Sequence, residues 1–254
     1  MIGIDLGSRH VKMVQMVADE IVKSEIFDTI DFYRTYTTRG KKGLLIEPSK
    51  LGFADDFIVA TGYGKITVQI ENAQHIPEIQ AHVIGATWQS GLSDFTLLDI
   101  GGQDTKVVKV RNKRVVDFLT NDRCAASSGR FMENMANVLG ISLDELALYS
   151  EEPVELNTTC AIFGETEIIA KIVEGYQTSH LAAGINYALY KRFASLLNKM
   201  ASEVIVLSGG GSKNYALQEI IVRERDVELV TLANPQLNGA LGCVVYGVEN
   251  NLAI

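Results

Sequence analysis

Cysteine is scarce in this sequence: Cys124, Cys160 and Cys243 are the only three among 254 residues. An odd and small number of cysteines does not form a disulfide framework in a reducing compartment. Each thiol is therefore expected to pack as a small apolar group, to bind a metal or to act as a nucleophile.

Long apolar runs and an excess of basic residues are also missing. No run approaches the roughly 20 residues needed to span a bilayer, and the N-terminus begins with a strand-like apolar pattern instead of a charged leader. Lysine and arginine number 23 against 31 acidic residues, so no basic stripe is available to neutralise phosphates. These absences predict a cytoplasmic protein that binds neither a membrane nor nucleic acid.

The remaining composition is that of a globular protein, with 47% hydrophobic residues, and strand and helix patterns alternate along the chain. This alternation predicts an α/β fold. A hairpin pattern at Met1–Asp5 and Val11–Val17 recurs at Lys106–Arg111 and Val115–Thr120, which indicates a duplicated unit.

The recurrence predicts two lobes. We expect a first lobe of residues 1–93, completed by the C-terminal helix within residues 237–254, and a second lobe of residues 94–236 that carries Cys124 and Cys160. The glycine and alanine residues of the C-terminal helix are expected to allow close packing.

Three apolar strands end in glycine turns, within the segments GIDLGS (3–8), LDIGGQD (98–104) and VLSGGGS (206–212). Glycines let backbone N–H groups approach an anion, and a neighbouring carboxylate can hold a hydrated Mg²⁺ against the same phosphates. The expected ligand is a nucleoside triphosphate. None of the turns matches the P-loop or the dinucleotide-binding fingerprint.

Two cysteines have similar surroundings, in NDRCAASSGRF (121–131) and NTTCAIFGETE (157–167), and a helical pattern follows each. A [4Fe–4S] cluster takes four thiolates, which a two-fold dimer of this chain would supply from Cys124 and Cys160. The free N–H groups of the following helices would point at the cluster. Two buried thiols or a four-thiolate zinc site remain alternatives. Cys243 lies in an apolar helical pattern and is expected to pack in the core.

These motifs resemble known ATPases. The order of the turns resembles the superfamily of acetate and sugar kinases, heat-shock chaperone ATPases and actin. More narrowly, ATGYG (60–64), DIGGQD, both cysteine segments and NGALG (238–242) resemble the ATPase activators of 2-hydroxyacyl-CoA dehydratases, the benzoyl-CoA reductase ATPase subunits and the reductases of double-cubane cluster proteins.

The resemblance covers nearly the whole chain and implies a two-lobed actin-like (ribonuclease H-like) ATPase fold with duplicated mixed-sheet lobes. It also implies ATP or ADP and Mg²⁺ as ligands, and a homodimer with one bridging [4Fe–4S] cluster. Such a dimer receives electrons from a flavodoxin or ferredoxin and passes them singly, at low potential, to a cluster-containing partner enzyme.

Motif and resemblance together assign candidate site residues. Asp99 and Asp104 are expected to act in catalysis through Mg²⁺ or its waters, and Gln103 to orient the attacking water. Asp5 joins Asp99 as a Mg²⁺ candidate, with Glu165 and Glu167 in second rank. The expected nucleotide-binding residues are Asp5, Gly7, Ser8, Arg9, Lys12, Gly101, Gly102, Gly209, Gly210 and Gly211. Arg9 stands where the family usually has threonine.

Two other functions compete with an ATP-dependent electron-transfer activator. A small-molecule kinase of the same superfamily would need a general base beside a substrate pocket, and the sequence offers no convincing one. An ATP-gated dimer with structural zinc would use the same two cysteines without redox chemistry.

Overall fold

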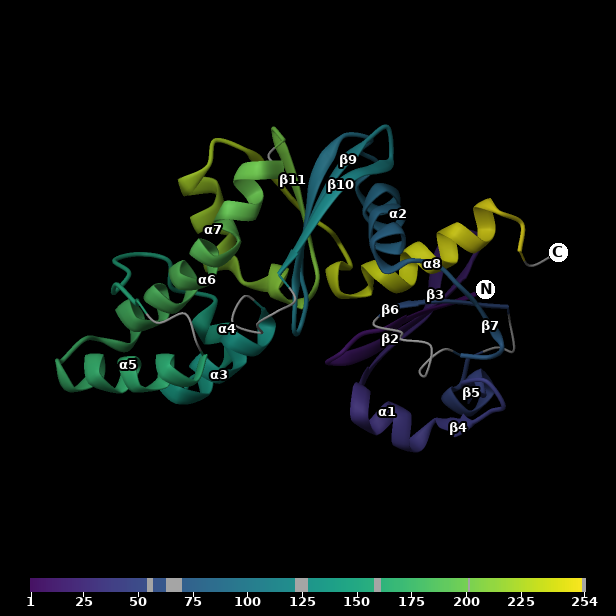
Figure 1. Ribbon diagram of the computed structural model, residues 1–254, viewed down its shortest axis with the longest axis horizontal. Coiled ribbons are helices and arrows are strands. Elements are labelled where there is room, and N and C mark those ends of the chain that lie inside the picture. The colour runs from purple at the N-terminus through teal and green to yellow at the C-terminus, as the bar shows by residue number, and fades with distance from the viewer. Residues whose placement is uncertain (54–56, 63–69, 122–127, 158–160, 201, 253–254) are drawn as a thin grey trace. The chain divides into compact units, whose positions relative to one another are not determined.

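The computed structural model describes residues 1–53, 57–62, 70–121, 128–157, 161–200 and 202–252, with the backbone alone for residues 161–163 (Figure 1). The chain forms two compact units. The first unit comprises Met1–Ser93, Asn112–Val115 and Gln236–Ile254, and the second comprises Asp94–Arg111 and Val116–Pro235.

The first unit contains a five-stranded mixed sheet with the order β3-β2-β1-β6-β7. Its strands are β1 (Ile2–Leu6), β2 (His10–Val17), β3 (Glu20–Asp28), β6 (Ile58–Gly62) and β7 (Ala73–His75). The central strand β1 runs antiparallel to β2 and parallel to β6. Every residue of β1 is buried, including Asp5.

Two long helices belong to this unit, α2 (Glu78–Ser90) and α8 (Asn238–Glu249). They pack closely because α8 is rich in small residues: a Cβ at Gly242 would collide with the carbonyl oxygen of Ala81. The predicted close packing is confirmed. The smaller elements are α1 (Thr29–Thr35), β4 (Thr37–Arg39), β5 (Leu44–Ile46) and the 3₁₀ helix η1 (Pro48–Leu51).

The second unit repeats this plan, with the strand order β10-β9-β8-β11-β12. Its strands are β8 (Phe95–Ile100), β9 (Thr105–Arg111), β10 (Arg114–Asn121), β11 (Val204–Ser208) and β12 (Glu228–Thr231). The central strand β8 is antiparallel to β9 and parallel to β11, as β1 is to β2 and β6. The prediction of duplicated mixed-sheet lobes is confirmed. The counterpart of the β1–β2 hairpin, however, is β8–β9, and not the predicted hairpin of residues 106–111 and 115–120, which is β9–β10.

The helices of the second unit are α3 (Gly129–Leu139), α4 (Leu143–Leu146), α5 (Ala161–Val173), α6 (Thr178–Met200) and α7 (Tyr215–Glu224). Short 3₁₀ turns, η4 (Gly210–Lys213) and η5 (Pro235–Leu237), follow β11 and β12. The core joins the sheet to α3, α6 and α7 through Leu98, Phe131, Phe193 and Ile220. Within the part of the chain that the structure describes, no helix is long and apolar enough to cross a membrane.

Candidate functional site

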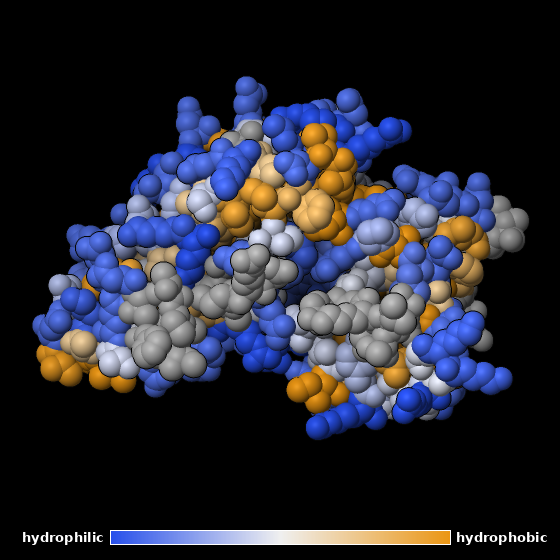
Figure 2. All heavy atoms as spheres, in the orientation of Figure 1, coloured by the Kyte–Doolittle hydropathy of each residue, from blue (hydrophilic) through white to orange (hydrophobic). Residues whose placement is uncertain are grey.

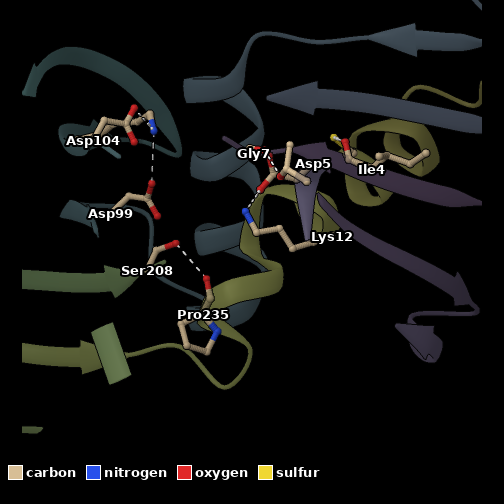
Figure 3. A network of polar contacts seen from close by, with 11 residues as sticks. Ile4, Asp5, Gly7, Lys12, Asp99, Asp104, Ser208 and Pro235 are labelled. Carbon is tan, nitrogen blue, oxygen red and sulfur yellow. Dashed lines mark hydrogen bonds and ion pairs between the residues drawn. The ribbon is translucent and has the colours of Figure 1, made fainter. Parts of the chain in front are cut away.

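Asp5 and Lys12 form an ion pair at the end of the central hairpin of the first unit (Figure 3). The two residues lie opposite each other in the β1–β2 register, and Lys12 Nζ is 3.0 Å from Asp5 Oδ2. Asp5 is 2% exposed, and none of the described residues donates a hydrogen bond to its Oδ1. A buried acceptor needs a partner, so Oδ1 is suited to a ligand, a metal ion or a water.

The turn that follows is held against the rest of the first unit. Thr29 Oγ1 donates to the carbonyl oxygen of Gly7 over 2.8 Å, and a Cβ at Gly7 would lie 2.6 Å from the carbonyl oxygen of His10. Glycine is therefore required in this turn. Ser8 is half-buried in the same turn.

Arg9, which the sequence places at the nucleotide, turns toward Asp28 in the structure. Its Nη1 donates to Asp28 Oδ2 over 2.6 Å. Asp28 caps α1 by accepting from the backbone N–H groups of Ile30 and Asp31. These two backbone hydrogen bonds are the main cause of the lowered pKa of Asp28, and Arg9 contributes to it. A role for Arg9 in nucleotide binding stays a prediction.

His82 of α2 is a buried residue that the sequence analysis did not single out. A Cβ at Gly239 would lie 2.8 Å from His82 Nε2 and 3.1 Å from Asp5 Oδ2. Asn238 Nδ2 donates to the carbonyl oxygen of His82 over 2.9 Å, which fixes the start of α8 against α2. Any side chain larger than that of glycine at position 239 would disturb Asp5.

The second unit has the equivalent arrangement, with an additional carboxylate. Asp99 lies opposite Lys106 in the β8–β9 register. Lys106 Nζ is 2.8 Å from Asp104 Oδ2 and 3.7 Å from Asp99 Oδ2 (Figure 3). Lys106 is 5% exposed and Asp99 2%. The structure thus brings the two predicted acids together around a lysine that the sequence analysis missed.

The turn between these acids is tight. Gly101 N donates to the carbonyl oxygen of Asp104 over 2.9 Å, and a Cβ at Gly101 would lie 2.8 Å from Asp104 Oδ1. Gly102 is half-buried, and the side chain of Gln103 is exposed to solvent. An exposed amide is accessible to an attacking water, and this role of Gln103 stays a prediction.

The same turn binds the N-terminus of α3. The carbonyl oxygens of Gly101 and Gly102 accept from Gly129 N at 2.9 Å and Arg130 N at 3.0 Å, and Ser128 Oγ donates to the Gly102 oxygen at 2.9 Å. Phe131 N donates to the oxygen of Ser128. The expectation that the first N–H groups of α3 point freely at a cluster is therefore wrong for these three residues.

The third glycine turn mainly allows neighbouring backbone segments to pack closely. Gly209 has a φ of 82°, and a Cβ there would collide with the carbonyl oxygen of Ile100. Gly209 N and Ser208 Oγ both donate to the carbonyl oxygen of Pro235, at 2.9 and 3.4 Å. Gly211 is buried against Ile100, whereas Gly210 is exposed.

The remaining acidic candidates lie on α5. Glu165 is exposed, and Glu167 Oε1 accepts from the backbone N–H of Asn157 at 2.8 Å. Glu167 therefore ties α5 to the segment before Cys160. The structure fixes neither acid beside the aspartates, and their contact with Mg²⁺ stays a prediction.

Cys124 and Cys160 lie outside the described residues. The predicted helices follow them: α3 begins at Gly129 and α5 at Ala161. Cys243 is fully buried in α8, as predicted. Burial, with a smaller contribution from the charge of Asp5, raises the pKa of the Cys243 thiol well above its ordinary value, which disfavours the thiolate that a metal would need.

The donor atoms suit Mg²⁺ better than a softer metal. The carboxylates of Asp5, Asp99 and Asp104 supply hard oxygen ligands, and Asp5 Oδ1 accepts no hydrogen bond from the described residues. At Asp99 and Asp104 the ammonium of Lys106 already provides a positive charge. The described residues contain no group of three or more His, Cys, Asp or Glu side chains placed to hold a metal.

Two mixed sheets of one design, each with an aspartate–lysine pair on its central hairpin, define an actin-like fold. MreB 5 of Spiroplasma citri bound to AMPPNP shares this fold, with a TM-score of 0.52 at 10% sequence identity, over 99% of this chain and 97% of that one. The chain belongs to the BadF/BadG/BcrA/BcrD ATPase family, which it matches over residues 2–247. The resemblance inferred from the motifs is thereby confirmed.

Two of the similar proteins are activators of dehydratases. The 2-hydroxyisocaproyl-CoA dehydratase activator of Clostridioides difficile is 33% identical over 258 residues, covering 97% of this chain and 94% of the relative. The (R)-2-hydroxyglutaryl-CoA dehydratase activating ATPase of Acidaminococcus fermentans is 34% identical over 254 residues, covering 98% and 96%.

One solved structure has the same fold over nearly the whole chain. The activator of the 2-hydroxyisocaproyl-CoA dehydratase from Clostridium difficile with bound ADPNP has a TM-score of 0.83 at 30% identity, covering 98% of this chain and 94% of that one. The chain is therefore an ATPase of the activator type.

Proposed function

We propose that this protein is an ATP-dependent electron-transfer activator. Two copies of the chain hold one [4Fe–4S] cluster through Cys124 and Cys160 of each, and ATP hydrolysis drives single electrons to a cluster-containing partner enzyme. A flavodoxin or ferredoxin supplies the electrons. The similarity to dehydratase activators supports the activator role and the existence of a partner enzyme.

One observation carries the proposal: the acidic turn of the second unit and the helix that follows Cys124 are joined by hydrogen bonds. Gly129 N, Arg130 N and Ser128 Oγ all donate to carbonyl oxygens of Gly101 and Gly102. Helices transmit a displacement of one end along their whole length, because their backbone is internally hydrogen-bonded. A nucleotide that shifts this turn would therefore shift α3.

The hairpin residues perform the nucleotide chemistry in this proposal. Lys12 donates to phosphate oxygens, and the backbone N–H groups beside Gly7 and Gly101 approach them without a side chain between. Asp5 and Asp99 hold Mg²⁺ directly or through its waters, which neutralises phosphate charge. Gln103 orients the attacking water. ATP must bind the two conformations with different affinities, because otherwise it shifts no equilibrium.

Helix α5, which begins directly after Cys160, has an apolar stripe that supports association with another protein. Ile169, Ile172 and Val173 are 51, 47 and 83% exposed and follow the spacing of one helix face. Figure 2 shows hydrophobic side chains at the C-terminal end of α5. Exposed apolar patches of this kind mark interaction surfaces.

The test is anaerobic purification followed by iron and sulfide analysis. We expect a brown dimer with about four irons for each pair of chains, because one cluster takes four thiolates. Colourless or monomeric material would contradict the cluster, and zinc in its place would favour the ATP-gated dimer. Phosphate transfer to a small molecule would favour a kinase.

Cysteine variants assign the ligands. Cys124→Ser and Cys160→Ser should each remove iron. Cys243→Ser is the matched control, since Cys243 is buried in α8, where its Sγ donates to the carbonyl oxygen of Ile4, and a serine hydroxyl can do the same. Loss of iron in Cys243→Ser alone would mean that the ligands are assigned wrongly.

A further inference from the structure

Lys106 is a buried cation between two carboxylates. Its side chain is 6% exposed, against 3% for Asp99 and 27% for Asp104. A buried ammonium is costly unless opposite charges compensate it, so the two carboxylates hold Lys106 in place and are held by it. The three groups together therefore carry one more negative charge than positive charge.

The first unit provides an internal comparison at the equivalent register position. Lys12 lies opposite Asp5 as Lys106 lies opposite Asp99. The Lys12 side chain is 18% exposed and pairs with Asp5 at 3.0 Å, whereas Lys106 is shared between Asp104 and Asp99. The second hairpin therefore combines more carboxylate charge with a more deeply buried lysine.

A bare divalent cation is poorly accommodated at this second hairpin. An ion ligated by Asp99 Oδ2 or Asp104 Oδ2 would come close to Lys106 Nζ, which lies 3.7 and 2.8 Å from these oxygens. Like charges repel strongly where water is excluded. Phosphate removes this conflict, because its oxygens ligate the metal and also accept hydrogen bonds from the ammonium.

We propose that Lys106 makes divalent-cation binding at Asp99 and Asp104 conditional on the phosphates of a nucleotide. The inference rests on the nucleotide binding of the proposed function. Without phosphate, the Lys106 ammonium pairs with the two carboxylates and excludes the metal. When phosphate is present, Lys106 donates to it, and the carboxylates become available to the metal or its waters.

The experiment measures binding of Mn²⁺, which takes the same oxygen ligands as Mg²⁺ and whose free ion gives an electron paramagnetic resonance signal. The full chain is freed of nucleotide and titrated with Mn²⁺ in the absence and presence of ADP. The wild type should bind Mn²⁺ tightly only with ADP. Lys106→Met, which keeps the length of the side chain without its charge, should bind Mn²⁺ without nucleotide roughly 10–100-fold more tightly than the wild type.

Two control variants test whether the effect depends on a positive charge at position 106 itself. Lys106→Arg keeps a cation at the site and should need ADP as the wild type does. Lys109→Met removes the same charge from the same strand, at a half-buried position opposite Thr96, and should also behave as the wild type. If Lys106→Met does not fold, Lys106→Gln replaces it, because its amide can donate to Asp104.

Two results would overturn the inference: tight Mn²⁺ binding by the nucleotide-free wild type, or a Lys106→Met protein that still requires ADP. Calorimetric titration of the wild type with ADP and Mg²⁺ distinguishes failure of this inference from failure of the proposed function. A protein that binds no nucleotide contradicts the proposed function. One that binds nucleotide, but binds Mn²⁺ equally well without it, contradicts only the inference about Lys106.

Discussion

At the residue scale, the two aspartate–lysine pairs are the clearest trace of the duplicated hairpin. Asp5 and Asp99 occupy the same position on the central strand of each sheet, and Lys12 and Lys106 face them from the next strand. Asp5 and Asp99 are each 2% exposed. Because burying a carboxylate is costly even when a lysine pairs with it, these residues indicate a function in binding and not in folding alone.

Replacement of Asp99 by asparagine tests this function. Asp99→Asn keeps the shape of the side chain and removes the charge that would hold Mg²⁺ or its waters, so ATP hydrolysis should fall roughly 10–100-fold. Phosphate release measures the rate, and iron content should not change. Asp117→Asn, at an exposed position on β10, is the matched control. Equal rates in wild type and Asp99→Asn would mean that the active site has been assigned to the wrong residues.

The acids and Lys12 could be predicted from the sequence, but Lys106, the lysine partner of Asp99, could not. Asp5 and Asp99 end unbroken apolar strands and precede glycines, a pattern visible without a structure. Lys106 and Lys109 both look like solvent-facing residues of a strand. Only the β8–β9 register places Lys106 opposite Asp99, and register depends on the geometry of the intervening turn. The hydrogen bond between Ser128 and Gly102 could likewise not be predicted, because it joins residues that are distant in the sequence.

At the scale of elements, the buried central strands were predicted, but of the edge strands of the two five-stranded sheets only β10 was. The apolar runs of β1, β6, β8 and β11 identify them, whereas β3 is mostly exposed and lacks an apolar run. Helix α7 was also missed, although Ala216, Leu217, Ile220 and Ile221 follow helical spacing. That spacing could have revealed it.

Helix α1 gives a prediction about pH. Asp28 accepts from two backbone N–H groups at its N-terminus, and these hydrogen bonds lower the pKa of the carboxyl group. A carboxylate with a lowered folded-state pKa stabilises the protein above its unfolded-state pKa, and this stability is lost as the pH falls through the folded-state value. The stability difference between wild type and Asp28→Ala should therefore shrink in acid.

Chemical denaturation across acidic and neutral pH measures this difference. Asp28→Asn separates the two roles of the side chain, because asparagine still caps a helix but loses the ion pair with Arg9. At neutral pH, Asp28→Asn should lie between wild type and Asp28→Ala in stability. A difference between wild type and Asp28→Ala that does not vary with pH would contradict the assignment.

At the scale of the whole molecule, duplication supplies two hairpins of one design, and among the described residues the second is hydrogen-bonded to the helix that follows Cys124. In the second unit, α3 follows Cys124 and is bound to the acidic turn through Ser128, Gly129 and Arg130. The hairpin of the first unit is instead tied to α1 through Gly7 and Arg9. Under the proposed function, we therefore expect the second unit to couple the nucleotide to the cluster.

The coupling can be tested by removing one hydrogen bond from that connection. In the wild type, a chelator should remove iron from the reduced protein at different rates with ADP and with a non-hydrolysable ATP analogue, because the nucleotide moves α3. Ser128→Ala removes the bond to the Gly102 oxygen. A hydrogen bond contributes about 1 kcal/mol, so this difference in rate should shrink by up to about fivefold while ATP hydrolysis continues.

Ser142→Ala is the matched control, since Ser142 caps α4 of the same unit through the N–H of Glu145 and makes the same kind of hydrogen bond away from the turn. It should keep the nucleotide-dependent difference of the wild type. An undiminished difference in Ser128→Ala would mean that the backbone bonds of Gly129 and Arg130 suffice or that the signal takes another route. Equal chelation rates with both nucleotides in the wild type, on protein shown to bind both, would contradict ATP-driven electron transfer even if the cluster were present.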